Sequence, residues 1–92
     1  MDFIYEENRI YLNDENGDTI AEIDFPKVGE NHVDLNHTYV SPVLRGQGVA
    51  EKLLLSAIDV IKSKNWKAYT SCSYVDGWAE SHPEKTDIFI RD

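Results

Sequence analysis

The sequence predicts a mixed α/β (α+β) domain, with a mostly antiparallel sheet, a central parallel βαβ unit and two helices. Two observations support this fold class. Apolar and acidic residues alternate over residues 21–25, as in a strand with one buried face. Farther along, an amphipathic helix lies between two strand-like segments and a second helix follows. The expected element order is therefore β-β-β-β-α-β-α-β.

Three short strands are expected to form a meander at the start of the chain. Residues 3–5 and 10–12 are apolar segments separated by polar residues, and residues 13–18 form a turn cluster with Asn-Gly at its centre. Asn-Gly strongly favours a tight hairpin turn. Residues 21–25 then return as the third strand.

A fourth strand is expected over residues 33–39, after a second turn at residues 26–31. Side chains two residues apart lie on the same face of a strand. His37 is therefore expected on an apolar face that also carries Val33, Leu35 and Tyr39. Pro42 ends this strand because proline lacks the N–H that a ladder needs.

The clearest helix is expected over residues 46–64, where apolar residues recur at spacings of three and four. They are Ala50, Leu53, Leu54, Ala57, Ile58 and Ile61. Residues 67–72 are expected to form a strand parallel to the strand that carries His37, with the helix as a right-handed crossover.

A second helix is expected after Cys72. The pattern Ser73-x-x-Asp76 is typical of a helix cap. Tyr74, Val75 and Trp78 would share one face, and Pro83 would end the helix. Residues 86–90 are expected to form a last short strand.

Length and composition predict a single domain over residues 1–92. No apolar run approaches the about 20 residues that span a bilayer, and the acidic start does not resemble a signal peptide, so we expect a cytoplasmic protein without membrane contact. One cysteine, Cys72, excludes an internal disulfide and a multi-cysteine zinc site. The histidines and carboxylates show no metal-ligand spacing, and we expect no metal.

The charge distribution disfavours nucleic acid as a partner. The formal net charge is −8, whereas binding to backbone phosphates needs a basic surface. Residues 1–42 carry ten acidic and two basic side chains, and residues 43–67 carry two acidic and five basic ones. This asymmetry fits either an unevenly charged solvated surface, or an anionic cofactor near the basic segment and a cationic substrate near the acidic one.

Residues 39–50 predict an anion site. They join a strand to a helix through a loop with one arginine and two glycines, Arg45, Gly46 and Gly48. Such a loop directs unpaired N–H groups and the positive end of the helix dipole at one point. The Walker pattern is absent because no Gly-Lys-Ser/Thr follows, and Glu51 stands where a dinucleotide fingerprint needs its third glycine.

Arg45-x-x-Gly48-x-Ala50 matches the Arg/Gln-x-x-Gly-x-Gly/Ala signature of the GCN5-related N-acetyltransferases. Together with Cys72-Ser73-Tyr74-Val75 and His82-Pro83-Glu84, residues 37–53 resemble the minimal members of that family, which are about as long as this chain. The likeness covers about residues 10–90 and implies the acetyltransferase fold.

The resemblance implies a site for acetyl-coenzyme A. The strand from His37 to Val40 would splay from its parallel neighbour, with pantetheine in the gap and the pyrophosphate on the loop. The implied cofactor-binding residues are Tyr39, Val40, Arg45, Gly46, Gln47, Gly48, Val49, Ala50, Ser73 and Tyr74.

The resemblance also implies one catalytic residue, Cys72, and the chemistry of the chain offers a second candidate, His37. Cys72 would accept the acetyl group or protonate the departing thiolate, and the alternative for this cysteine is a small buried hydrophobe. His37 is a candidate general base because its ordinary pKa is close to neutrality, and the alternative is a structural histidine. His82 is expected to terminate the second helix, and Tyr74 and Trp78 to pack in the core.

The expected function is acetyl transfer from acetyl-coenzyme A to an amine. The family's usual helices between the first strands are missing, so the acceptor is expected to be exposed or large, such as a small-molecule amine, a polyamine or a protein amine. The alternatives are a non-catalytic coenzyme A-binding module and a loop that binds no nucleotide. We expect a monomer or a weak dimer.

Overall fold

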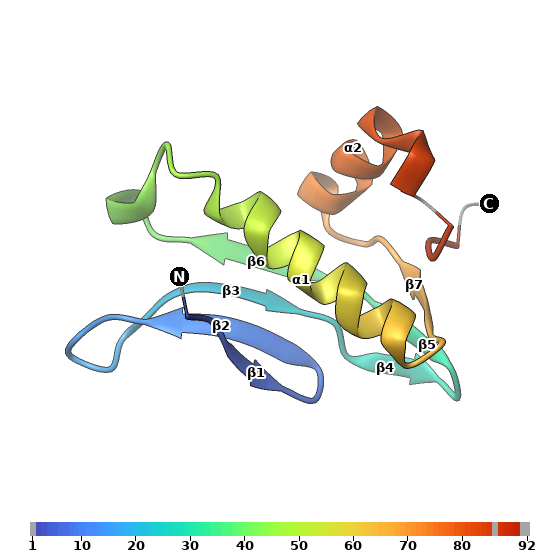
Figure 1. The fold of residues 1–92 in the computed structure, drawn as a ribbon, viewed down its shortest axis with the longest axis horizontal. Helices are drawn as coiled ribbons and strands as arrows, with labels where there is room; N and C mark the ends of the chain where they lie inside the picture. Colours follow the sequence, from blue (N-terminus) through green and yellow to red (C-terminus); the bar gives the residue numbers. More distant parts are fainter. Residues whose placement is uncertain (1, 86, 91–92) are drawn as a thin grey trace.

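The computed structural model describes residues 2–85 and 87–90 (Figure 1). An antiparallel sheet has the strand order β1-β2-β3-β6, and a second sheet has the order β4-β5-β7, in which β5 and β7 are parallel. The strands are β1 (Ile4–Glu6), β2 (Arg9–Asn13), β3 (Thr19–Asp24), β4 (Lys27–Gly29), β5 (His32–Asp34), β6 (His37–Val40) and β7 (Lys67–Tyr69). The helices are α1 (Val49–Ser63) and α2 (Ser73–Ser81), with 3-10 turns η1 (Pro42–Leu44) and η2 (Pro83–Lys85). The predicted α+β class is confirmed.

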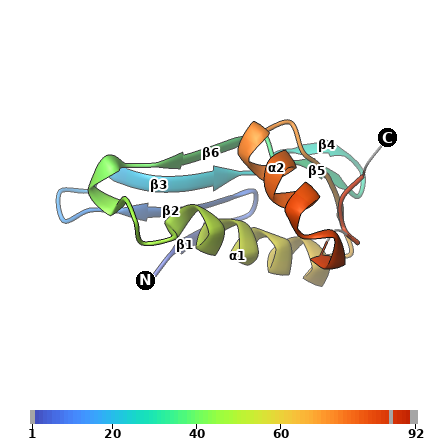
Figure 2. The ribbon, with the colours of Figure 1, turned by 90° about the horizontal axis from the view of Figure 1, so that it is seen from above.

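Helix α1 packs along one face of the four-stranded sheet, as Figure 2 shows. Its buried side chains are Val49, Leu53, Leu54, Ala57, Ile58 and Ile61. Five of these six were predicted, but the apolar face begins at Val49 rather than Ala50. The helix starts later than expected because Gly46 and Gly48 both have positive φ, which is not helical. No described helix is long and apolar enough to cross a bilayer.

The predicted fourth strand is divided into β5 and β6. Val33 and Leu35 are buried, but the next inward side chains are Thr38 and Val40, so one extra residue shifts the alternation. The prediction that His37 lies on the apolar face is therefore wrong, and His37 is exposed on the opposite face. The parallel partner of β7 is β5, not the segment that carries His37.

Other boundaries also differ from the sequence prediction. The expected turn at residues 26–31 contains strand β4, which pairs with β5. Strand β7 ends at Tyr69 rather than at residue 72. The expected last strand is present as a single parallel bridge between Ala68 and Phe89, and its first residue, Thr86, lies outside the described residues.

Helix α2 starts from Cys72, which is its N-cap residue, so the predicted Ser73 cap is wrong by one position. The Asp76 carboxylate accepts a hydrogen bond from the Thr70 hydroxyl at 3.1 Å. Trp78 is buried and donates its Nε1–H to Glu51 of α1 at 2.8 Å, which fixes α2 against the start of α1. Helix α2 ends at Ser81, two residues before Pro83, as predicted.

Candidate functional site

The loop between β6 and α1 has a defined backbone path. The Ser41 hydroxyl accepts from the Val43 N–H at 3.4 Å and caps η1, and Arg45 N–H donates to the Pro42 carbonyl at 3.1 Å. Gly46 and Gly48 then adopt φ of 81° and 67°. A Cβ at either glycine would have no neighbour within 4 Å, so their role is conformational and the space beside them is open.

The first turn of α1 offers unpaired donors. Gly48 caps the helix without a side-chain hydrogen bond, and the first N–H to reach its carbonyl is that of Lys52 at 3.1 Å. Within residues 2–85 and 87–90, the N–H groups of Gly46 and of residues 48–51 donate to no protein acceptor. Such a row of N–H groups at the positive end of the helix dipole is an anion-binding arrangement.

Arg45 lies in the loop directly before this row. Its side chain is exposed and forms no ion pair with any described residue. Glu51, the acidic residue of the first turn, accepts a hydrogen bond from the indole N–H of Trp78 at 2.8 Å. Arg45 is thus available to an anion at the helix start.

The strands diverge at the start of β6, and this loop follows the end of the same strand. The Leu35 N–H donates to the Tyr69 carbonyl at 2.9 Å, and the Leu35 carbonyl accepts from the Cys72 N–H at 3.1 Å. Beyond that bond, β6 pairs with β3 alone among the described strands. Tyr39 and Val40 therefore lie on a strand whose other edge has no ladder partner, and the splay implied by the family resemblance is present.

Cys72 lies where the splay begins. Its thiol is half-buried and its Sγ is 3.7 Å from the Thr38 hydroxyl of β6. Two residues later, Tyr74 is partly exposed at the start of α2. Burial raises the pKa of the Tyr74 hydroxyl, and the charges of Glu51 and Cys72 raise it further. The environment of Tyr74 therefore favours the protonated hydroxyl more than water does.

His37 belongs to a different group, on the face of the sheet opposite α1. Ligand-type atoms of Glu22, Asp24 and His37 lie within 4.8 Å of one another. Arg9 donates its Nε–H to Glu22 at 2.8 Å and lies 3.7 Å from Asp24. The sequence spacing did not indicate this cluster, because the residues come from three strands.

The charges in this cluster have opposite consequences for two carboxyl groups. The hydrogen bond from Arg9 lowers the pKa of Glu22. Burial, followed by the negative charge of Glu22, raises the pKa of Asp24. The folded environment therefore favours the protonated form of Asp24 more than water does.

The predicted cofactor-binding residues lie on the three segments that border the splay: the end of β6, the loop into α1 and the start of α2. The structure brings Cys72 close to β6, but it does not bring His37 to Cys72. The sequence analysis did not identify Thr38 or the Glu51–Trp78 pair as parts of this region. The two residues of that pair are 27 positions apart, so no local sequence pattern indicates that they are in contact.

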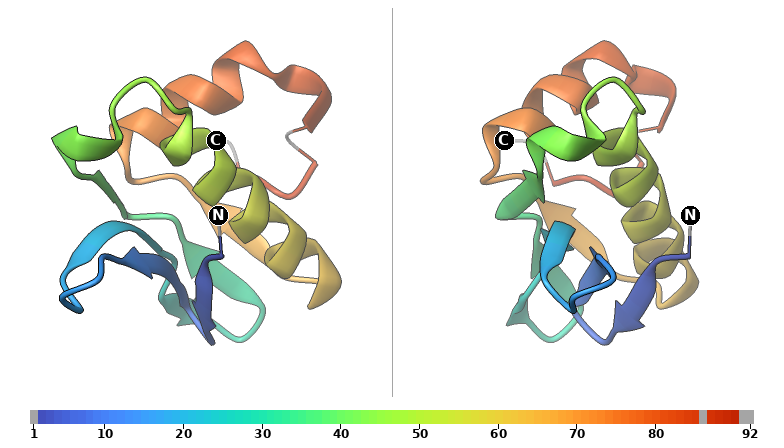
Figure 3. Two further views of the ribbon diagram at one scale, coloured as in Figure 1. Left: turned by 60° about the vertical axis from the view of Figure 1, so that its left-hand side comes forward. Right: turned by 90° about the vertical axis from the view of Figure 1, so that its left-hand side faces the viewer.

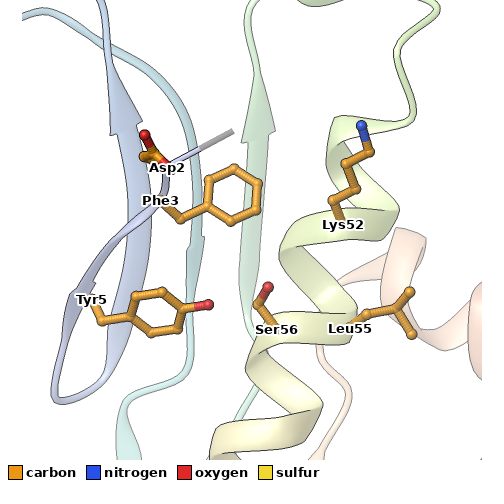
Figure 4. Close-up of a pocket in the computed structure, with 6 residues that line it drawn as sticks. All are labelled: Asp2, Phe3, Tyr5, Lys52, Leu55 and Ser56. Atoms are coloured by element: carbon orange, nitrogen blue, oxygen red, sulfur yellow. The ribbon is translucent and has the colours of Figure 1, made fainter.

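A separate cavity of about 550 Å³ lies between β1 and the first half of α1 (Figure 4). It is lined by Asp2, Phe3, Tyr5, Lys52, Leu55 and Ser56. None of the predicted cofactor-binding or catalytic residues lines it, so it is distinct from the splay.

Sequence comparison connects this arrangement to a known family. A family model described as GCN5-related N-acetyl-transferase matches residues 9–88. Protein NATD1 of Xenopus tropicalis is 36% identical over 56 residues, which are 61% of this chain and 51% of that protein. The chain therefore spans about half the length of the curated relatives it matches.

Solved structures agree with the sequence match. The solution structure of a GCN5-like candidate N-acetyltransferase from Staphylococcus aureus has a TM-score of 0.81 at 31% identity, and covers 97% of this chain and 87% of its own. N-acetylglutamate synthase from Neisseria gonorrhoeae, solved with coenzyme A and N-acetyl-glutamate, has a TM-score of 0.62 at 19% identity over 80% of this chain and 18% of its own. The latter likeness shows the fold alone.

The cluster around Asp24 predicts a pH-dependent stability. A carboxyl group whose folded pKa is raised above 3.8 stabilises the folded state when protonated, and this contribution is lost as the pH rises through the folded pKa. Asp24→Asn should therefore unfold at higher urea than the parent at neutral pH. The difference should shrink as the pH falls through the folded pKa of Asp24 and be nearly absent below about 4, where the carboxyl group is protonated in both the folded and the unfolded state. The exposed turn variant Glu15→Gln is the control. A difference for Asp24→Asn that is constant with pH would contradict the assignment.

Proposed function

Because this chain belongs to the GCN5-related N-acetyl-transferase family, we propose that it transfers the acetyl group of acetyl-coenzyme A to an amine. The observation that carries the proposal is the joint position of the anion-binding loop and the splay. The row of free N–H groups at the start of α1 lies at the end of β6, the same strand that leaves its parallel neighbour at Cys72.

The proposed cofactor lies along this path. Its pyrophosphate would accept hydrogen bonds from the unpaired N–H groups of the loop and pair with the Arg45 guanidinium. The open space beside Gly46 and Gly48 would let the backbone of the whole segment, which also includes Gln47, Val49 and Ala50, approach the phosphates. Its pantetheine would pair with the free edge of β6 at Tyr39 and Val40, and Ser73 and Tyr74 would border the other side. The N-acetylglutamate synthase of the same fold was solved with coenzyme A, which supports this choice of ligand.

The proposed chemistry needs one proton donor near the sulfur of the cofactor. The neutral amine attacks the thioester carbon, the C–N bond forms and the C–S bond breaks, and the departing thiolate takes up a proton. We propose the Cys72 thiol or the Tyr74 hydroxyl as the proton donor, because Cys72 lies where the splay closes and Tyr74 follows it at the start of α2. Alternatively, Cys72 first accepts the acetyl group and passes it to the amine.

The amine must lose a proton before it attacks. His37 is exposed on the outer face of β6, one residue before Thr38, which contacts the thiol on the inner face. We propose His37 as the base for an amine that approaches from the outer face. The rival function, coenzyme A binding without catalysis, would appear as tight cofactor binding with no turnover over a broad amine panel.

Arg45→Gln should weaken coenzyme A binding about five- to tenfold at low salt, because one phosphate-directed charge is lost at an exposed site. Isothermal titration calorimetry of the two proteins measures the change. Lys85→Gln is the matched control, since it removes the same charge from an exposed position outside the loop. Equal affinities of the parent and Arg45→Gln would remove Arg45 from the site.

Cys72→Ser should lower acetyl-coenzyme A turnover with a reactive amine about 100-fold while leaving coenzyme A affinity nearly unchanged, because a serine hydroxyl is a far weaker acid and nucleophile than a thiol. Release of free coenzyme A measures turnover. Thr38→Val is the control, because it removes the 3.7 Å contact but keeps the thiol. Full activity of Cys72→Ser would exclude an essential thiol and leave Tyr74 as the proton donor.

A further inference from the structure

Among the described residues, no helix packs against the outer face of the four-stranded sheet. Helix α1 lies on the other face, where Ile10, Ala21 and Ile23 are buried, and Figure 3 (right) shows the strands β1 to β3 with α1 on one side alone. Because alternate side chains point to opposite faces, the cross-strand partners on the outer face are set by the register. They are Ile4, Glu6, Arg9, Tyr11, Glu22, Asp24, His37 and Tyr39.

This face already holds one cation of the chain itself. The Arg9 guanidinium lies 3.9 Å from the centroid of the Tyr11 ring and donates to Glu22 at 2.8 Å. On the other side of Glu22, the register places Tyr39, which is 41% exposed and has no cation on its ring among the described residues. This face therefore already binds one cation between an aromatic ring and a carboxylate, and Tyr39 offers a second ring beside the same carboxylate.

An open cavity of about 530 Å³ continues the same face beyond Arg9. Three carboxylates line it, from Glu6 on β1, Glu7 in the following turn and Asp24 on β3, against the single cation Arg9. Arg9 is paired with Glu22 at 2.8 Å and also lies 3.7 Å from both Glu6 and Asp24, so it is shared among several carboxylates, whereas Glu7 forms no ion pair with a described residue. The unbalanced negative charge is thus spread over several strands rather than gathered at one point, which suits a ligand with several positive charges.

The cavity lies beside the closed end of the splay. Asn36 lines it and donates its N–H to the Asp24 carbonyl at 3.3 Å. The preceding residue, Leu35, accepts the Cys72 N–H that closes the splay. If coenzyme A binds as in the proposed function, its pantetheine chain occupies the splay between β6 and the segment after β7. An amine in the cavity would then be near the end of that chain.

We propose that the acceptor is a lysine side chain in a basic segment of a polypeptide, which lies on the outer face and places that lysine beside Asn36. The open face favours a polypeptide over a free polyamine, since a small ligand gains little from a site without walls. Residues 1–42, with ten acidic and two basic side chains, complement such a segment. The lysine ammonium first gives one proton to a base, for which His37 is placed. The neutral amine then attacks the thioester carbon. The proton that its nitrogen loses when the amide forms is equivalent to the proton that the departing thiolate takes up.

Amide NMR spectra of the coenzyme A-saturated protein test the proposal. The probe is a synthetic peptide with several lysines and blocked ends, and the matched probe is the same peptide with every lysine acetylated. We expect the lysine peptide to shift Glu6, Glu7, Asp24, Asn36 and His37, and the acetylated peptide to shift them far less. Glu7→Gln should weaken binding about two- to fivefold, as expected for one exposed charge pair, whereas Glu15→Gln should leave it nearly unchanged.

Three results would overturn the proposal: equal binding of the two peptides, shifts that avoid the outer face, or equal affinities of the parent and Glu7→Gln. Tighter binding of spermine than of the lysine peptide at the same amides would instead identify a free polyamine as the acceptor and contradict the polypeptide. Coenzyme A alone is titrated first. If coenzyme A alone causes no shifts at Gly46 and Gly48, the proposed function is wrong. This outcome is independent of any result on the outer face.

Discussion

The hydrogen bond from the Cys72 N–H to the Leu35 carbonyl is the constraint on which the rest of the site depends. It is the last backbone bond that joins β5 and its extension to the segment after β7. One residue later, Asn36 turns toward β3 instead, and β6 continues with a free edge. A strand edge without a partner presents unpaired N–H and C=O groups with which another extended chain can pair. The extended pantetheine of the proposed cofactor would do so.

The same break separates two chemical environments across one strand. Because an extra residue shifts the side-chain alternation after Leu35, Thr38 faces the Cys72 thiol and His37 faces Asp24. In the proposed reaction the thiol and the base therefore lie on opposite faces of β6, and the amine would reach the thioester beside Asn36, where the splay closes. The basic loop at Arg45 and the acidic outer face correspond to the two halves of the uneven charge distribution.

Local patterns in the sequence predicted most of the elements, because they depend on nearest neighbours along the chain. The periodicity of α1 identified five of its six buried residues, and the glycine loop indicated the donors that the structure leaves unpaired. The division at Leu35 and Asn36 could not be predicted, since it depends on bonds to Tyr69 and Asp24, far along the chain. The error placed His37 on the wrong face. The cluster with Glu22 and Arg9 was missed for the same reason.

The most direct test of the account is an amide NMR titration of the protein with coenzyme A. The account predicts saturable shifts that follow the path of the cofactor, at Gly46 and Gly48 in the loop, at Tyr39 on the free edge of β6 and at Cys72 where the splay closes. Shifts that avoid Gly46, Gly48 and Cys72 while the protein remains folded would contradict it.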